Sequence, residues 1–536
     1  MKRIVIILAL VTTVALPFVL RPKQASVEKA DATLVIITPH NESIRHEFGL
    51  GFKEWYRART GRVVAIDWRV IGGTAEITRF LEGEYTAAFQ NFWTGKLGKP
   101  WSSEVQAGFQ SDPAPTAPAL VREARAAFLS SATSCGIDLF FGGGPYDFIK
   151  QATAGRIVDS GLLQLHPEWF RPETIPQAFA GETYWDKGGR WIGTVLSSYG
   201  IVYNRDSLQR LGLDREPRQW SDLQDPRYFG EVALADPTKS SSIAKAFENI
   251  LQQQMQRRWV ALQAAQPSLD AKQRETQAVR EGWIEGLRLM QLISANSRYF
   301  TDTSQKPPID VAAGNCAAGI CIDFYGRQQE EAVRRRAGSA RLGYASPPGG
   351  TVSSVDPIAL LRGAPNREIA VAFIEYVLSL EGQRLWSFKP GTPGGPEHFA
   401  LRRLPVRRDF YAHQEWKALR NDTETEPFAQ ENQLIYRGEW TGGVFRELAF
   451  IIRVMGQDTH PELVKAWKAI NAAPEPVKSK ALAALQDLSM VGYDRAKGDI
   501  KRALGSKNKV DEIRLANELG AEFRRNYARA LELAGQ

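Results

Sequence analysis

The sequence has few of the residues that build disulfide frameworks and metal clusters. Its 536 residues include only three cysteines, Cys135, Cys316 and Cys321, and six histidines. Three cysteines exclude a disulfide-rich scaffold and a multi-cysteine zinc cluster, and no two histidines have the spacing of metal ligands on one helix. Cys316 and Cys321 are close enough in sequence to pair across a turn; the alternative is that both are small buried hydrophobic residues.

The motifs of several enzyme classes are also missing. The chain has no G-x-x-x-x-G-K-[ST] loop, so it does not hydrolyse ATP by that route. It has no H-E-x-x-H pair and no G-x-S-x-G elbow, and the glycines at 142–144 lack the spacing of a dinucleotide-binding loop. These absences favour a binding function over a catalytic one.

Charge of one sign is in only mild excess. The chain has 68 Lys and Arg against 60 Asp and Glu, a formal net charge of +8. This excess suits an anionic ligand or an anionic membrane face and does not require nucleic acid. We therefore expect no nucleic-acid partner.

Only one hydrophobic run approaches membrane-spanning length, and it lies at the N-terminus. Lys2 and Arg3 precede an apolar run over residues 4–20, which is the pattern of an export signal. No cysteine follows before Cys135, which argues against a lipoprotein anchor. We expect an exported, periplasmic protein, either released by cleavage or anchored to the membrane by an uncleaved N-terminal segment. Residues 1–32 would form this signal or anchor and a tether.

Short strands of the buried type alternate with helical patterns along much of the chain. Helical periodicity after several of these strands is the βαβ signature of a parallel sheet. Residues 86–132 are less regular and predict an insertion over the first sheet, whereas residues 461–536 predict a helical C-terminal extension. The predicted strands are 34–38, 63–70, 137–141, 191–204, 231–235, 317–324 and 355–361.

Several segments between residues 33 and 410 together resemble a known family. In order and spacing they resemble the extracellular solute-binding proteins of ABC importers, in the branch for iron(III), polyamines and phosphosugars with the type II periplasmic fold. The segments are Gly161-Leu-Leu163, Asp138-Leu-Phe-Phe-Gly-Gly-Gly144, the strand-like 191–204 (WIGTVLSSYGIVYN), Trp220-Ser-Asp-Leu223, Asp236-Pro-Thr-Lys-Ser-Ser-Ser242, Ile322-Asp-Phe-Tyr-Gly-Arg327, Ser353-Ser-Val-Asp-Pro-Ile-Ala359 and 366–386.

The resemblance implies an α/β, two-lobed periplasmic-binding-protein-like fold with a helical C-terminal extension. Lobe 1 is expected over 33–175 and 350–460, and lobe 2 over 176–349. In such folds the ligand binds at the carboxyl ends of the strands, between the lobes.

The implied function is capture of a small anionic or metal-containing solute by closure of the lobes, followed by delivery to a membrane permease. The implied partners are ABC permease and ATPase subunits, and the receptor itself is expected to be a monomer without catalytic activity. Two alternatives remain: an exported enzyme acting on a small or carbohydrate substrate in the cleft, and a membrane-anchored sensor domain.

Polar residues and glycines at the ends of the predicted strands are the candidate ligand-binding residues. Glycines let a ligand approach the backbone amides, and helix N-termini favour anions. For each position a purely structural role, such as a turn or a helix cap, is the alternative. The candidates are His40, Asn41, Gly73, Thr74, Gly143, Gly144, Tyr199, Ser240, Ser241, Ser242, Tyr325 and Asp356.

Among the candidates, Tyr325 is the most informative about the chemical class of the ligand. Relatives that bind iron(III) typically carry two adjacent tyrosines in this segment, and here Phe324 takes the neighbouring position. This departure weakens the case for Fe³⁺ as the transported ligand. The candidate metal ligands are His40 and Tyr325 with a nearby carboxylate, and no resident cofactor is expected. Arg327, close to Tyr325, equally suits an anionic organic solute.

Overall fold

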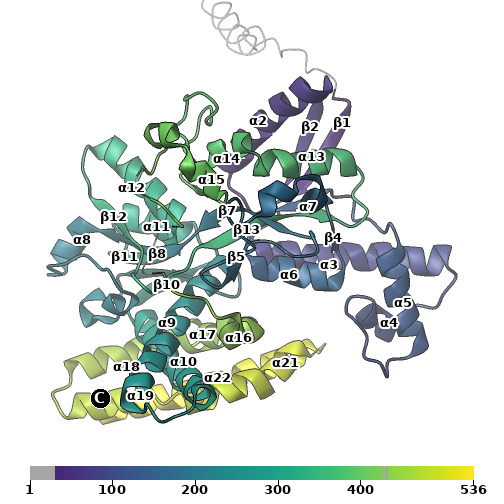
Figure 1. Ribbon diagram of the computed structural model, residues 1–536. Helices are drawn as coiled ribbons and strands as arrows, with labels where there is room; N and C mark the ends of the chain where they lie inside the picture. Colours follow the sequence, from purple (N-terminus) through teal and green to yellow (C-terminus); the bar gives the residue numbers. More distant parts are fainter. Residues whose placement is uncertain (1–29, 424, 429–432, 507, 536) are drawn as a thin grey trace, which may run out of the picture.

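A computed structural model describes residues 30–423, 425–428, 433–506 and 508–535 (Figure 1). The predicted export signal or anchor, apart from its last residues, lies outside these ranges. Over the ranges given, no helix is both long enough and apolar enough to cross a membrane.

The first sheet is mixed and forms the core of lobe 1. Its strands run in the order β14-β7-β13-β3-β1-β2, and β4 also pairs with β13. The central β1 is parallel to β2 and β3, whereas β13 is antiparallel to β3 and β7. The bounds are β1 (Ala32–Ile37), β2 (Val64–Arg69), β3 (Leu139–Phe141), β4 (Ile157–Val158), β7 (Ile192–Ser197), β13 (Ser354–Leu361) and β14 (Leu404–Pro405).

The second sheet forms the core of lobe 2, in the order β10-β9-β11-β8-β12. Here β9 is parallel to β10 and β11, and β8 is antiparallel to β11 and β12. A small hairpin, β5 (Ala178–Phe179) and β6 (Glu182–Thr183), stands apart from both sheets. The strands of the second sheet are β8 (Tyr199–Asn204), β9 (Val232–Ala235), β10 (Ser297–Thr301), β11 (Ala318–Ile322) and β12 (Leu342–Ala345).

Within the described residues, the chain passes between the two lobes at three places. The first is Ser198, which separates β7 of the first sheet from β8 of the second. The second is the segment 346–353 between β12 and β13. The third lies after residue 433. There the Tyr436 amide donates to the carbonyl of Ala180 in lobe 1, and the next amide, of Arg437, donates to the side chain of Gln252 in lobe 2.

These crossings move the lobe boundaries expected from the sequence. The sequence predicted one extended segment over 191–204 and a boundary at 175/176, but residues up to Ser197 belong to lobe 1 because Tyr184, Ile192 and Leu196 are buried in its core. Likewise, Trp440 and Ile452, expected in lobe 1, are buried in the core of lobe 2.

Helices cover both sheets. In lobe 1, α2 begins at the cap Asn41 and ends at Gly61, whose left-handed φ of 70° suits a residue without a side chain. Short 3-10 and π turns connect many of the elements. The α-helices of the two lobes are α2 (Glu42–Thr60), α3 (Thr74–Asn91), α4 (Ser103–Gly108), α5 (Ala119–Ser130), α6 (Pro145–Ala154), α7 (Leu162–Leu165), α8 (Arg205–Arg210), α9 (Ser241–Ala265), α10 (Ala271–Ala295), α11 (Lys306–Ala312), α12 (Asp323–Ala337), α13 (Arg367–Leu378), α14 (Leu380–Ser387) and α15 (Arg408–Ala412).

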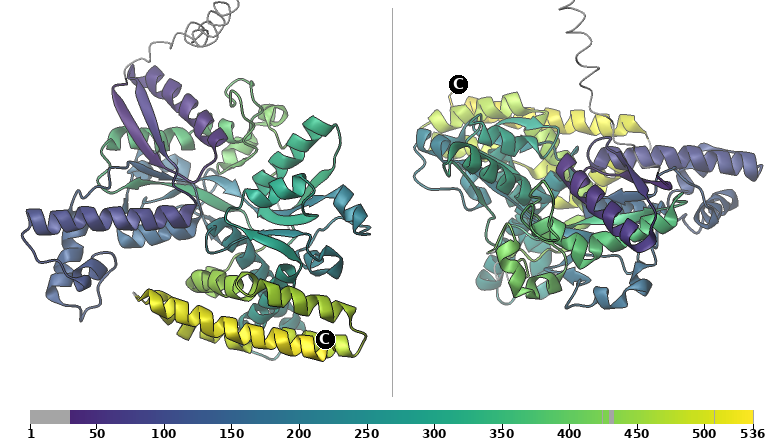
Figure 2. Two further views of the ribbon diagram at one scale, coloured as in Figure 1. Left: turned by 180° about the vertical axis from the view of Figure 1, so that it is seen from behind. Right: turned by 90° about the horizontal axis from the view of Figure 1, so that it is seen from above.

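The segment predicted as an insertion over the first sheet is instead a helical arm. The end of α3 together with α4 and α5 projects sideways from lobe 1 (Figures 1 and 2). The arm contains aromatic side chains that are continuous with the lobe 1 core, in which Phe89 contacts the rings of Trp101, Phe109 and Phe128. Arg125 joins the arm to α6 by donating to the carbonyl of Ala154 at 2.7 Å.

The C-terminal helices form a layer against α9 and α10 (Figures 1 and 2). They share one hydrophobic core with the second sheet, in which Phe523 and Trp467 are buried with Trp283. The Trp283 indole donates to the Val491 carbonyl at 2.8 Å. The predicted helical extension is therefore part of lobe 2. Its helices are α16 (Gly438–Thr441), α17 (Phe445–Ile452), α18 (His460–Ala472), α19 (Val477–Leu485), α20 (Tyr493–Arg495), α21 (Lys501–Gly505) and α22 (Lys509–Leu533).

The two neighbouring cysteines do not form a bridge. Cys316 and Cys321 are free thiols, and both are buried. They are small buried residues on and beside β11, as the second of the two alternatives predicted.

Candidate functional site

The candidate residues follow the carboxyl ends of strands that face the boundary between the lobes. His40 follows β1, Thr74 follows β2 and Gly143 follows β3 in lobe 1, while Ser241 follows β9 and Tyr325 follows β11 in lobe 2. These loops come from both sheets, and contacts between them define the candidate site.

One contact joins the lobes directly. The Thr74 hydroxyl donates to the Ser241 hydroxyl at 3.0 Å. A Cβ at Gly73 would lie 3.0 Å from the Lys239 carbonyl oxygen, and one at Gly143 would lie 2.0 Å from the Thr74 methyl carbon. Gly143 also has a φ of +114°, where a side chain is strained. Gly73, Thr74, Gly143 and Ser241 therefore lie together, and each glycine is needed for the close approach.

Asp147 lies beside this contact and was not predicted. It is buried in the first turn of α6, and Thr78 donates to its Oδ1 at 3.3 Å. Burial raises the pKa of its carboxyl, and the hydroxyls of Ser241 and Thr74 partly oppose this. Because a carboxyl occupies the start of α6, this helix end suits a hydroxyl or amine better than the anion expected at Gly143 and Gly144.

Four other candidates lie at the starts of helices. Asn41 accepts from the Ile44 amide at 3.1 Å and Ser240 from the Ile243 amide at 3.4 Å. Gly144 is the N-cap residue of α6, and Ser242 follows Ser241 in the first turn of α9. Asn41 and Ser240 thus cap α2 and α9, as the structural alternative proposed.

His40 is buried at the edge of the lobe 1 sheet. Its ring meets Phe141 edge to face at 4.6 Å and Trp386 at 6.0 Å, and Gly142 gives it room because a Cβ there would lie 2.4 Å from Nε2. Burial, with the nearby charges of Arg403 and Arg45, lowers the pKa of His40 well below its usual value. The imidazole is therefore neutral at physiological pH.

Arg403 is the main residue of the candidate site that was not predicted from the sequence. Its side chain is fully buried (0% exposed) and forms an ion pair with Asp356 at 2.8 Å. It also donates to the hydroxyl of Ser197, the last residue before the first crossing. Its guanidinium lies 4.2 Å from the centre of the Phe324 ring in lobe 2. Arg403 therefore contacts both lobes where the chain crosses between them.

The local sequence gives only a faint signal for this arginine. Arg403 lies between Leu401 and Val406, in an otherwise apolar stretch interrupted by a second arginine, Arg402. A cation inside an apolar run is the single clue, because the partner Asp356 is 47 residues away in sequence. The candidate Asp356 was predicted, but its partner was not.

The remaining candidates surround Arg403. Burial raises the pKa of Tyr325 to about 12, while Arg403 acts against this shift, so the phenol is protonated at neutral pH. Burial also raises the pKa of Asp323, with Arg327 and Arg403 opposing it. Tyr199 follows the first crossing, is buried, and its amide donates to the Thr351 hydroxyl at 3.0 Å.

The surroundings of His40 and Tyr325 suit an anion better than a trivalent cation. Within the described ranges there is no group of three or more His, Cys, Asp or Glu side chains that could hold a metal ion. The positive charge of Arg403 acts on both predicted metal ligands, and like charges at this range repel. A metal site at His40 and Tyr325 stays a prediction.

A second inter-lobe contact is ionic. Lys245 of α9 binds Glu182 of β6 at 2.6 Å and Glu248 at 2.8 Å, and its ammonium lies 3.4 Å from the centre of the Tyr436 ring. Burial lowers the pKa of Lys245, but the charges of Glu182 and Glu248 outweigh it and raise this pKa. This buried network, joined by a hydrogen bond from Ser354 to Glu182, was not predicted.

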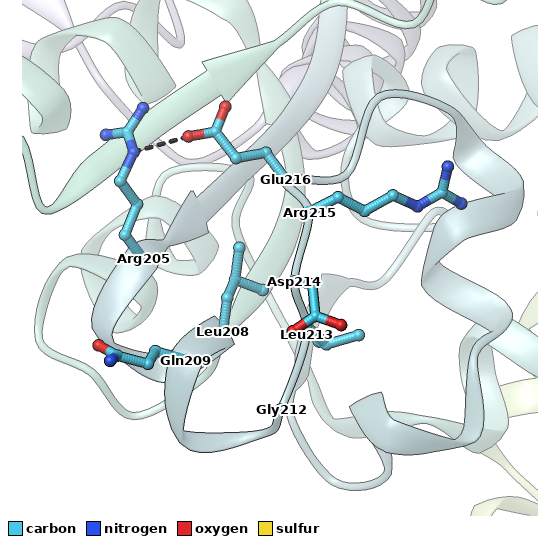
Figure 3. A pocket seen from close by; sticks show the side chains of 8 residues that line it. All are labelled: Arg205, Leu208, Gln209, Gly212, Leu213, Asp214, Arg215 and Glu216. Atoms are coloured by element: carbon cyan, nitrogen blue, oxygen red, sulfur yellow. Dashed lines mark hydrogen bonds and ion pairs between the residues drawn. The ribbon is translucent and has the colours of Figure 1, made fainter.

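Two surface cavities lie outside this group of residues. One, of about 310 Å³, is beside α8 in lobe 2; the residues lining it include Arg205 and Glu216, which form an ion pair at 2.7 Å (Figure 3). The other, of about 350 Å³, lies between the lobes, with Ser43 and His398 on one side and Arg335 of α12 on the other.

Parts of the chain are similar in sequence to known proteins. Residues 137–403 match the family model of the bacterial extracellular solute-binding proteins. An uncharacterized protein of Haemophilus influenzae is 26% identical over 248 residues, which cover 46% of this chain and 60% of the relative. The phosphoglycerate transport regulatory protein PgtC of Salmonella typhimurium is 24% identical over 196 residues, or 36% of this chain and 40% of PgtC.

Solved structures of low sequence identity are also similar. The periplasmic binding protein AfuA of Actinobacillus pleuropneumoniae, solved with fructose-6-phosphate, is 17% identical with a TM-score of 0.44, covering 73% of this chain and 99% of AfuA. The curated relatives are matched over less than two thirds of their own length. Over residues 137–403, the chain is thus similar to the bacterial extracellular solute-binding proteins.

Proposed function

We propose that this protein is the exported solute receptor of an ABC importer. The observation that carries the proposal is the contact of two strand-end loops, Thr74 of lobe 1 and Ser241 of lobe 2, across lobes joined by three narrow crossings. A solute that touches both loops stabilises the closed arrangement over the open one. The closed receptor then docks on a permease, and an ATPase drives release and uptake.

The receptor performs no chemistry in this proposal. The residues that meet at the boundary cap helices, donate hydrogen bonds or pair charges across the lobes. Asp147, Thr74 and Ser241 offer hydroxyl and carboxyl groups, while Arg403 offers a fixed positive charge. These groups orient and hold a polar solute, and similarity to an extracellular family supports a periplasmic location.

A regulatory receptor is the second candidate. PgtC is named as a transport regulatory protein, which favours a sensor that reports solute binding to another protein. The helical layer on lobe 2 would then carry the changed position of that lobe to the partner. No observation favours the exported-enzyme alternative in the same way.

Stoichiometric binding without turnover tests the proposal. Protein stripped of ligand is screened by thermal shift against sugar phosphates, phosphoglycerate, carboxylates, polyamines, oligosaccharides and ferric salts. A solute at 100 times its Kd stabilises the native state by about 2.7 kcal/mol. We expect one class to raise the Tm, to be recovered unchanged by mass spectrometry, and to reduce the radius of gyration in X-ray scattering. Product formation, or the absence of binding across all classes, would overturn the proposal.

An uptake assay separates the two candidates. Deleting the gene abolishes accumulation of the labelled solute if the protein is an importer receptor. If it is a sensor, deletion leaves uptake through a constitutively expressed permease intact and removes only the transcriptional response to the solute.

A further inference from the structure

We propose that the solute carries an oxyanion, a carboxylate or a phosphate, which binds the free N–H groups of Arg403 and Trp386 beside His40. This inference rests on the proposed function and names the ligand class of the same site. It is carried by a group of buried polar atoms at the lobe boundary.

Arg403 uses only one side of its guanidinium. Its Nη2 atom makes the ion pair with Asp356 and donates to Ser197. Its Nε and Nη1 atoms are buried and find no hydrogen-bond partner among the residues described. A buried guanidinium keeps its charge and its five N–H donors at any physiological pH. The Nε and Nη1 atoms of Arg403 can therefore both donate to an acceptor on a bound solute.

Two neighbours have unpaired atoms as well. The indole Nε1 of Trp386 and the Nε2 of His40 are buried and have no hydrogen-bond partner within the described chain. The guanidinium lies 5.4 Å from the centre of the Trp386 ring, which in turn is 6.0 Å from the His40 ring. Buried polar atoms are nearly always paired in folded proteins, so three such side chains in one cluster indicate a ligand site.

The negative groups nearby leave this cluster positive. Asp356 balances only one charge, and the positive charges of both Arg327 and Arg403 act on Asp323. Burial raises the pKa of Asp323, so its negative charge is disfavoured. N–H donors arranged around a fixed positive charge recognise carboxylate and phosphate oxygens.

A second buried arginine, Arg407, shows the hydrogen bonding expected of an arginine with a structural role alone. Arg407, 6% exposed, lies over the Trp169 ring at 5.0 Å and pairs with Asp409. All three of its nitrogens have acceptors, because Nε and Nη2 bind Asp409 and Nη1 binds the Leu378 carbonyl. Arg403 has the same stacking and one carboxylate, but its remaining donors are unsatisfied.

The adjacent loop indicates what else the solute carries. A Cβ on Gly142 would meet His40, and one on the next residue, Gly143, would meet Thr74, so the donor cluster and the Thr74–Ser241 contact are neighbours. There the Oδ2 atom of Asp147 is buried and accepts no hydrogen bond of normal geometry within the described residues, although the hydroxyls of Ser241 and Thr74 lie close enough to lower the pKa of this carboxyl. A solute hydroxyl would satisfy it. We therefore infer a hydroxylated organic anion, such as a hydroxy acid or a phosphorylated polyol.

Matched pairs of solutes test the charge. Stripped protein is titrated by calorimetry and thermal shift with glycerol 3-phosphate against glycerol, with malate against malamide, and with inorganic phosphate and putrescine. We expect anionic members to bind and their neutral partners and putrescine to fail. Binding of the phosphate members alone, or of the carboxylate members alone, identifies which oxyanion the site takes.

Variants test the donors. Arg403→Gln should weaken binding of the responding anion about 100-fold, and Trp386→Phe, which keeps the ring and removes one N–H, about 10-fold. The control Arg407→Gln should stay within about 2-fold of wild type. Trp386→Phe keeps the test valid if Arg403→Gln fails to fold.

The outcomes separate this inference from the proposed function. Binding of neutral or cationic solutes with lobe closure, or equal anion affinity in wild type and both variants, overturns the oxyanion assignment and leaves the receptor intact. A lack of response to every anion also overturns it. The receptor proposal fails only if no solute of any class binds.

Discussion

At the scale of single residues, the Arg403–Asp356 pair of lobe 1 lies where the lobes are joined, with the Arg403 guanidinium 4.2 Å from the centre of the Phe324 ring of lobe 2. The arginine is fully buried, and its carboxylate partner lies on β13 just after the second crossing. Removing one partner of a buried ion pair leaves an uncompensated charge, and this costs more free energy than the intact ion pair contributes to stability. We therefore expect the pair to hold Arg403 in place beside the crossings and to position its remaining donors.

Asp356→Asn should cost about 3 kcal/mol of unfolding free energy, since it leaves the Arg403 charge buried with only a neutral partner. Urea denaturation measures this loss of unfolding free energy, provided that the m-value is the same in both proteins. Asp409→Asn, which affects the corresponding Arg407 pair away from the hinge, is the control for solute binding: it should lower stability without changing affinity. Equal affinity losses in both variants would contradict the assignment of Asp356 to the hinge.

His40 should make stability depend on pH. Its pKa is lowered in the folded state, so the unfolded chain binds a proton more readily below the usual value of about 6.5. The contribution is present above about pH 6.5 and is lost as the pH falls, by up to about 1.4 kcal/mol per unit. Urea unfolding of wild type and His40→Asn from pH 7.5 to 5.0 isolates it.

The informative quantity is the difference in unfolding free energy between wild type and His40→Asn at each pH. His460 also has a lowered pKa, whereas burial raises the pKa of Asp147 and Asp323, which act in the opposite direction. These effects are common to both proteins and cancel. Parallel pH profiles for wild type and His40→Asn would show that His40 is not the titrating group.

At the scale of elements, the loop between β3 and α6 packs against Thr74, whose hydroxyl donates to Ser241 of the other lobe. Gly143→Ala adds a methyl that meets the Thr74 side chain, at a φ that alanine avoids. We expect a loss of about 2 kcal/mol in stability and a more open molecule in X-ray scattering. Gly212→Ala, also at positive φ but with open space around it, should lose only about 1 kcal/mol and keep its radius of gyration.

The strand and helix pattern could be predicted where hydrophobic runs are long and bounded by turns. The predicted segments 34–38, 231–235 and 355–361 correspond to β1, β9 and β13. The segment 191–204 looked continuous because no local signal marks Ser198; only its pairing with two different sheets splits it. The four-residue β12 follows a charged segment and offers no hydrophobic run to detect.

The candidate site shows the same division between local and long-range information. Thr74, Gly143 and Ser241 follow strands, so strand order alone predicts that they lie at one edge, and they do meet. Arg403, Lys245 and Asp147 could not be predicted because their importance comes from contacts with residues far away in sequence. A residue's own neighbours do not reveal such contacts.

At the scale of the whole molecule, we expect the C-terminal helices and lobe 2 to unfold together, because they share one hydrophobic core. Phe523 of α22 is buried in the core that contains Val232 of β9 and Ile293 of α10. Phe523→Ala should cost about 3–5 kcal/mol and speed amide exchange in β9 and β11 as well as in α22. The exposed Arg525→Ala should change stability by less than about 0.5 kcal/mol. Faster exchange confined to α22 would show that these helices form an independent unit.

The helical arm on lobe 1 would make a small rotation between the lobes easy to detect. Because α4 and α5 extend outward from lobe 1 while the helical layer belongs to lobe 2 (Figure 2), any small rotation about the crossings is magnified at their tips. Fluorophores placed at the turn after Gly98 and at the end of α21 would therefore turn solute capture into a change in energy transfer, with neither dye near the cargo.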